Sequence, residues 1–185
     1  MNSTEAGLVI YNPEAPDTGD NDISGTVFDT THAQSAAIKW HMGGGLRITH
    51  NKILAHRYGF LIEMTDEGRH SDLIFANNSV EAQAESCMLY RRLGQRIFTN
   101  VQLQNNQMVC EGPHVIKVET PSPWLSDILI TGNILHCLPG SHQVVFSGRH
   151  SALVKDNLLK GTGVNPVVVE AGASDIVVGY NKPPA

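Results

Sequence analysis

An asparagine returns every 24 to 28 residues along this chain, each time inside the same frame of apolar residues. Apolar side chains stand five and three residues before the asparagine and, in all repeats but the last, two residues after it. The first full repeat is Leu46-x-Ile48-x-x-Asn51-x-Ile53, and the later asparagines are Asn78, Asn106, Asn133, Asn157 and Asn181. A fixed period of this size indicates a repeat architecture, in which each unit packs on the next.

The frame alternates with a period close to two and breaks at the asparagine, which predicts a short strand that runs into a turn. A second alternating segment follows each turn, and these segments are 36–39, 60–63, 87–90, 116–119, 144–147 and 167–170. Two strands with their corners form one coil of a solenoid. Thr26 occupies the asparagine position of an earlier repeat, so we expect about seven coils in a single domain that spans residues 1–185.

These repeats resemble the right-handed parallel β-helix, or pectate-lyase-like, superfamily, which includes polysaccharide lyases, polygalacturonases and phage tailspikes. The resemblance covers about Leu8 to Asn181 and is one of architecture. It implies an all-β fold in which the asparagines stack in a ladder and hydrogen-bond their neighbours along the axis. We also expect the asparagines to adopt left-handed backbone, which this residue type tolerates. Small residues four positions later, among them Cys110 and Cys137, are expected at a tight corner.

Composition excludes several classes of partner. A net charge of -5 argues against general affinity for nucleic acid or an anionic membrane. The sequence has no apolar run of membrane-spanning length, and Met1 to Asp20 lacks the features of a signal peptide. The resemblance to tailspikes implies an extracellular or virion-surface location, reached by a route other than a signal peptide or as part of a longer protein or assembly.

No cofactor or metal is predicted. The nine histidines are scattered over turns without HExxH spacing, and no CxxC pair or phosphate-binding loop is present. Cys110 and Cys137 stack in adjacent coils, within the range of a disulfide. We favour two buried thiols because the same position elsewhere holds alanine or glycine.

The outward row of the second strands carries the candidate chemistry. Glu63 and Glu119 stand two rungs apart in this row, which places them at roughly 9 to 10 Å, near the upper end of the range for an inverting glycosidase. Tyr90 is expected between them, with Arg91 beside it, to provide an aromatic face and a cation for a sugar. In one register the row reads Lys39, Glu63, Tyr90, Glu119, Ser147 and Glu170.

Other interpretations of this row stay open. An outward strand row must be polar, so the same residues fit a solvated face without a ligand. A polysaccharide lyase that uses Tyr90 or Arg91 with Lys39 is a third alternative. The motifs of polygalacturonases and pectate lyases are absent, and Tyr58-Gly59-Phe60 only begins the alginate epimerase motif, so none of these specific activities is implied.

A second outward row, four residues before each asparagine, becomes apolar toward the C-terminus: Arg47, Ile74, Gln102, Leu129, Leu153 and Val177. Aliphatic side chains on the outside of a solenoid need a cover. Three covers are compatible with the pattern: loops of the same chain, another domain, or packing of three copies around an axis, which we favour. Neither Asn2–Gly7 nor Lys182–Ala185 has the sequence of a solenoid cap, so flanking domains or subunits are expected at both ends.

The sequence thus predicts a homotrimeric, tailspike-like β-helix that recognises polysaccharide. Substrate contact is assigned to Lys39, Tyr90, Arg91 and Glu170, and glycan hydrolysis by Glu63 and Glu119 is a further hypothesis. The competing prediction is a shaft or stabilising module with no ligand and no enzymatic activity.

Overall fold

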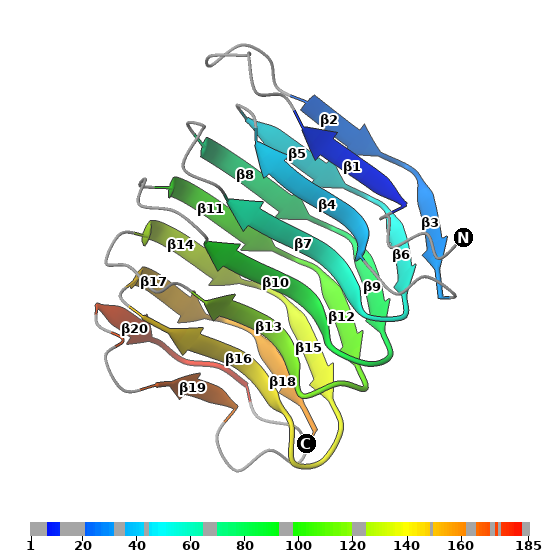
Figure 1. Ribbon diagram of the computed structural model, residues 1–185. Helices are drawn as coiled ribbons and strands as arrows, with labels where there is room; N and C mark the ends of the chain where they lie inside the picture. Colours follow the sequence, from blue (N-terminus) through cyan, green and yellow to red (C-terminus); the bar gives the residue numbers. More distant parts are fainter. Residues whose placement is uncertain are drawn as a thin grey trace.

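The fold is a parallel β-helix in which three β-sheets wind around one apolar core (Figure 1). A computed structural model describes residues 7–11, 21–31, 36–42, 45–64, 70–92, 98–119, 125–148, 150–161, 166–170, 173 and 175–182. Every strand pair in this part of the chain is parallel, and the chain visits the three sheets in a fixed order with a right-handed sense of winding.

The first sheet has seven strands: β1 (Leu8–Tyr11), β4 (Ala36–Met42), β7 (Tyr58–Met64), β10 (Ser86–Arg92), β13 (His114–Glu119), β16 (His142–Ser147) and β19 (Val167–Val169). The second sheet also has seven: β2 (Asn21–Ser24), β5 (Leu46–Thr49), β8 (His70–Ala76), β11 (Phe98–Gln104), β14 (Leu125–Thr131), β17 (His150–Lys155) and β20 (Ile176–Val178). The third sheet has six: β3 (Val27–Thr30), β6 (Lys52–Ala55), β9 (Ser79–Ala82), β12 (Gln107–Cys110), β15 (Ile134–Cys137) and β18 (Leu158–Lys160).

Each coil therefore has three strands, where the sequence predicted two. The residues that follow Asn51, Asn78, Asn106, Asn133 and Asn157 form strands of the third sheet, although the sequence pattern alone places them in a corner. A four-residue segment holds only two inward side chains, so its alternation does not distinguish a strand from a turn. The number of complete coils is smaller than the predicted seven, because β1 and β20 lack the other strands of their coils.

The asparagine ladder is confirmed. Asn106 Oδ1 accepts hydrogen bonds from Asn78 Nδ2 at 3.1 Å and from the Asn78 backbone N–H at 2.9 Å. Asn106 Nδ2 in turn donates to Asn133 Oδ1 at 3.0 Å and to the Phe75 carbonyl at 2.8 Å. The pattern repeats from Asn51 to Asn181, so these buried amides are satisfied and each one links neighbouring coils.

The left-handed backbone lies one residue before the ladder, and the prediction for the asparagines themselves was wrong. Residues with φ between 54 and 68° immediately precede the ladder positions: Gly25, His50, Asn77, Asn105, Gly132 and Asp156. Glycine, asparagine and aspartate dominate this row because they tolerate that conformation. The ladder side chains are thereby turned inward, where they stack.

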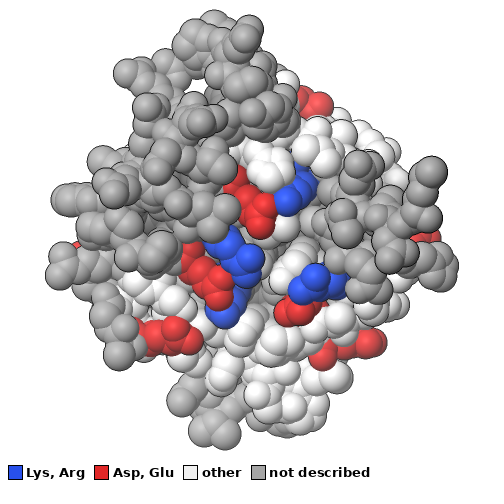
Figure 2. Space-filling view, in the orientation of Figure 1, with Lys and Arg blue, Asp and Glu red and all other residues white. Residues whose placement is uncertain are grey.

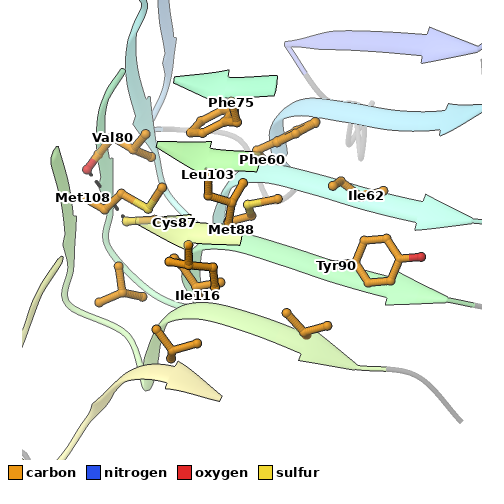
Figure 3. Packing of buried hydrophobic residues seen from close by; sticks show 14 of the residues in the cluster. Phe60, Ile62, Phe75, Val80, Cys87, Met88, Tyr90, Leu103, Met108 and Ile116 are labelled. Carbon is orange, nitrogen blue, oxygen red and sulfur yellow. Dashed lines mark hydrogen bonds between the residues drawn. The ribbon is translucent and has the colours of Figure 1, made fainter. Parts of the chain in front are cut away.

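The core lies between the three sheets (Figure 3). Phe60 of β7 stacks on Phe75 of β8 with ring centroids 5.4 Å apart. The predicted row of small residues is in register and buried, but Cys110 and Cys137 end the strands β12 and β15, where the sequence predicted only a corner. Cys110, Cys137 and the third cysteine, Cys87, are all thiols, as favoured from the sequence.

Candidate functional site

The outer face of the first sheet brings together most of the predicted site residues. Glu63 of β7, Arg91 of β10 and Glu119 of β13 lie in register on three successive strands. Ser147 of β16 continues this row, and Glu170 follows the end of β19. We call Lys39, Glu63, Arg91, Lys117, Glu119, Ser147 and Glu170 the charged ladder.

Tyr90 lies on the opposite side of the sheet, so its predicted outward position was wrong. The ring is 3% exposed and sits in the core row between Ile62 and Val118 (Figure 3). The corner before β10 spans residues 83–85, one residue more than the corner 56–57 before β7. This extra residue shifts the alternation by one place, which turns Tyr90 inward and Arg91 outward.

Lys39 also differs from its predicted register, because it pairs with Leu61 and not with Glu63. Its row lies two residues before that of Glu63, on the same outward face. The long side chain spans this offset, and Lys39 Nζ lies 2.6 Å from Glu63 Oε2.

Lys117 is a member of the ladder that the sequence reasoning missed. It lies two residues before Glu119 on β13, so the period of a strand alone places both on one face. Lys117 Nζ and Arg91 Nε bind different oxygens of the Glu119 carboxylate, and the Arg91 distance is 3.3 Å. Ser147 Oγ donates to Glu170 Oε2 at 2.5 Å. Figure 2 shows basic and acidic side chains side by side on the face turned to the viewer.

The electrostatics of Glu119 restrict what this carboxyl can do. Burial raises its pKa, but the hydrogen bond and charge of Lys117, followed by those of Arg91, outweigh burial and lower the pKa below its usual value. Glu119 is therefore ionised near neutral pH. An ionised carboxylate suits a general base or a hydrogen-bond acceptor, whereas a general acid needs a raised pKa.

The predicted separation of Glu63 and Glu119 agrees with the register, since one strand lies between theirs. Rungs of a sheet stand about 4.8 Å apart, which gives roughly 9 to 10 Å between the two backbone positions. Arg91 occupies the intervening rung. Both carboxylates are ion-paired, with Lys39 and with Lys117 and Arg91, so a substrate would replace these contacts.

The second sheet carries a different kind of surface. The predicted outward stripe is in register from Arg47 through Ile74 to Val177. A shallow groove of about 590 Å³ runs along its C-terminal half, where Leu129, Leu153 and Val177 lie beside the carboxylates of Asp127 and Asp175. Val177 is 60% exposed.

The described ranges contain no group of three or more histidine, cysteine, aspartate or glutamate side chains suited to a metal ion. They also contain no helix long and apolar enough to cross a membrane. The fold thus defines the chain as a parallel β-helix with a charged outer face. Comparisons with models of protein families, with curated proteins and with solved structures find no match.

Proposed function

We propose that this β-helix recognises polysaccharide through the charged ladder, in the manner of a tailspike-like surface protein. The observation that carries the proposal is the row Glu63, Arg91, Glu119 and Ser147, in which carboxylate acceptors alternate with a guanidinium and a hydroxyl donor at rung spacing. Sugar hydroxyls both donate and accept hydrogen bonds, so alternating donors and acceptors suit them. A periodic ligand matches a periodic face.

The rigidity of the sheet supports the same proposal. Beneath the ladder, β7, β10 and β13 each lie between two hydrogen-bonded parallel strands. The ion pairs Lys39–Glu63 and Arg91–Glu119 also hold these side chains in place before a ligand arrives. The four side chains are 18 to 41% exposed, so they remain accessible to a ligand. A preorganised surface loses less entropy on binding than a flexible one.

A panel of acidic and neutral polysaccharides tests this function. Immobilised glycans are incubated with the intact chain, and retention of the protein is measured at several salt concentrations. The proposal predicts retention on at least one glycan, with weaker retention at higher salt because the ladder is charged. Silence across the panel would favour the competing function, a shaft or stabilising module with no ligand.

Glycan hydrolysis is the second candidate, favoured by the two-rung separation of Glu63 and Glu119. In an inverting mechanism the lowered pKa of Glu119 assigns it the role of the base that activates water. Glu63 would then be the proton donor, a role that requires the substrate to displace Lys39 from this carboxylate. The variants Glu63→Gln and Glu119→Gln are assayed for chain shortening of any glycan that the wild-type protein cleaves, and unchanged cleavage by both would remove the assignment. Unsaturated products that absorb in the near ultraviolet would instead indicate a lyase.

We also propose that three copies pack through the apolar stripe of the second sheet. Leu129 and Leu153 of neighbouring copies would meet at the axis and leave water. Light scattering of the wild type and of Leu153→Lys tests this assembly, with Lys160→Gln on the third sheet as the control. At low concentration, a threefold loss of mass in Leu153→Lys that Lys160→Gln does not share supports the packing, and an unchanged mass in Leu153→Lys contradicts it.

A further inference from the structure

The exposed apolar side chains of the described residues gather at the two ends of the solenoid. Among the described residues, the large hydrophobic side chains classed as exposed are Val9, Val27, Leu138, Val169, Val177, Val178 and Tyr180. All except Leu138 lie in the first or last strands or directly after them. The partly buried residues that pack against the main core follow the same rule, since they are Leu8, Ile10, Ile23, Phe28, Val167 and Ile176.

Among the described residues, the outermost strands at these ends also have fewer strand neighbours than the inner ones. β1, β2 and β3 are the outermost strands of the three sheets at one end, and β19, β20 and β18 are outermost at the other. Each outermost strand has one neighbouring strand where the inner ones have two. Exposed edges of this kind accept a further strand.

The two ends fit one another in the order of winding. The described chain starts in the first sheet with β1 and then passes repeatedly through the second, third and first sheets. It leaves the second sheet after β20, and Lys182 then forms a bridge with Leu158 of β18 in the third sheet. The next sheet in the winding order is the first, to which β1 belongs.

We propose that copies of this chain stack head to tail, so that β1, β2 and the coil they begin in one copy continue the sheets that end at β19 and β20 of another. In this register, each inward-facing apolar row of one copy continues in an inward-facing apolar row of the next. The row that ends at Val169 begins at Ile10, and the row that ends at Val178 begins at Ile23. Each of these half-covered side chains meets an apolar partner across the junction and is removed from water.

A second copy is the occupant that the molecule itself supports. The proposed junction repeats the interface that already joins successive coils within the chain, with parallel strands in register and the same core rows. Because the two contacting ends differ, the contact is heterologous and the assembly grows without closing. Each copy contributes seven strands to the first sheet, which lengthens the stack by about 34 Å at ordinary strand spacing.

The asparagine ladder is interrupted at this junction. Within the chain, the backbone N–H of each ladder residue donates to the next asparagine, as Asn157 does to Asn181 Oδ1 at 3.1 Å. The position that would follow Asn181 is Thr26 of the next copy. Its hydroxyl donates to the Ser24 carbonyl and brings no amide. The junction is therefore weaker than the contacts between coils, which makes the stack reversible.

Sedimentation over a hundredfold range of concentration tests the stacking. The wild type is expected to grow continuously in mass, while Val178→Lys and Val169→Lys stop the growth because they place a charge in the junction. Both side chains are about half exposed at 47% and 44%, so the variants should fold, which circular dichroism checks. Leu138→Lys is the matched control, since Leu138 is 49% exposed but lies away from both ends and should leave the growth unchanged.

Thr26→Asn provides the opposite test, because it supplies the missing amide. The restored hydrogen bonds should lower the concentration needed for half-assembly by about tenfold. The proposal is overturned if the wild type keeps one mass at all concentrations, as a monomer or a closed trimer would. It is equally overturned if Leu138→Lys blocks growth as strongly as Val178→Lys, or if Thr26→Asn does not strengthen the assembly.

Discussion

Asn106 Oδ1 receives two hydrogen bonds from Asn78, one from its side-chain amide and one from its backbone N–H. From Asn78 to Asn181, each ladder residue is in this way the partner of both a side chain and a main chain in the coil before it. The buried amides stabilise the stack as a network, so loss of one member leaves several polar groups without partners.

Asn106→Ala should lower the free energy of unfolding by about 3 kcal/mol, because buried groups of Asn78 and Asn133 and the Phe75 carbonyl lose their hydrogen bonds. Urea denaturation measures the change. Gln107→Ala, at an exposed neighbouring position, is the control and should remain within about 0.5 kcal/mol of the wild type. Equal effects of the two substitutions would mean that the side-chain hydrogen bonds of Asn106 do not stabilise the fold.

Tyr90 and Arg91 are adjacent in sequence but lie on opposite sides of β10. Their replacement by alanine should therefore lower the free energy of unfolding by different amounts. Tyr90→Ala should cost about 3 to 5 kcal/mol, because it leaves a cavity in the core. Arg91→Ala should cost less than about 1 kcal/mol, as expected for a partly exposed ion pair. Thermal unfolding of both variants checks the register. Reversed magnitudes would restore the outward position that the sequence predicted for Tyr90.

The stability should fall in mild acid. Burial lowers the pKa of His150 from its ordinary value of 6.5, although the Ser147 carbonyl raises it in part. The unfolded chain therefore binds a proton more readily than the folded chain. The contribution of the neutral His150 to stability is fully present above pH 6.5 and is lost as the pH falls through the pKa of His150 in the folded protein.

His150→Phe should reduce this dependence, since the ring at this position packs beside Phe146 at 5.9 Å. Unfolding free energies measured between pH 5 and pH 8 for the two proteins decide the matter. His136→Phe, at an exposed position on β15, is the control. If His150→Phe keeps the full slope of the wild type, His150 is not responsible for it.

The thiols should be unreactive until the solenoid opens. Cys87, Cys110 and Cys137 are each no more than 2% exposed, and burial raises the pKa of Cys87 and of Cys137. Iodoacetamide should label none of them in buffer and all three in concentrated urea. Mass spectrometry counts the labels. Rapid labelling in buffer would show that the thiols are accessible to solvent in the folded protein, which contradicts the prediction.

The extent to which the sequence predicted the structure depends on the signal at each position. The ladder from Asn51 to Asn181 was predictable because one residue type recurs in a constant frame. The stripe that includes Leu129 and Leu153 was predictable because it lies before the asparagine, at a fixed distance. Both predictions use spacing within one strand and turn.

The candidate site was less predictable because it lies beyond a corner of variable length. The corner residues 83–85 and 56–57 differ by one residue, so counting from the asparagine misplaced Tyr90 and hid the central position of Arg91. Lys117 was detectable from its two-residue spacing to Glu119. The contact of Lys39 with Glu63 depends on a long side chain that crosses between rows, which the period of a strand does not encode.

The affinity of the charged ladder for polysaccharide is the most direct measurement of the proposed function. The glycan retained best by the wild type is titrated into the wild type, into Arg91→Ala and into Lys52→Ala, an exposed control on the third sheet. Arg91→Ala should weaken binding by about tenfold or more, because a hydrogen-bonded charge at the centre of the ladder is lost, and Lys52→Ala should match the wild type. Equal affinity of Arg91→Ala and the wild type, or no binding to any glycan, would contradict recognition by this face.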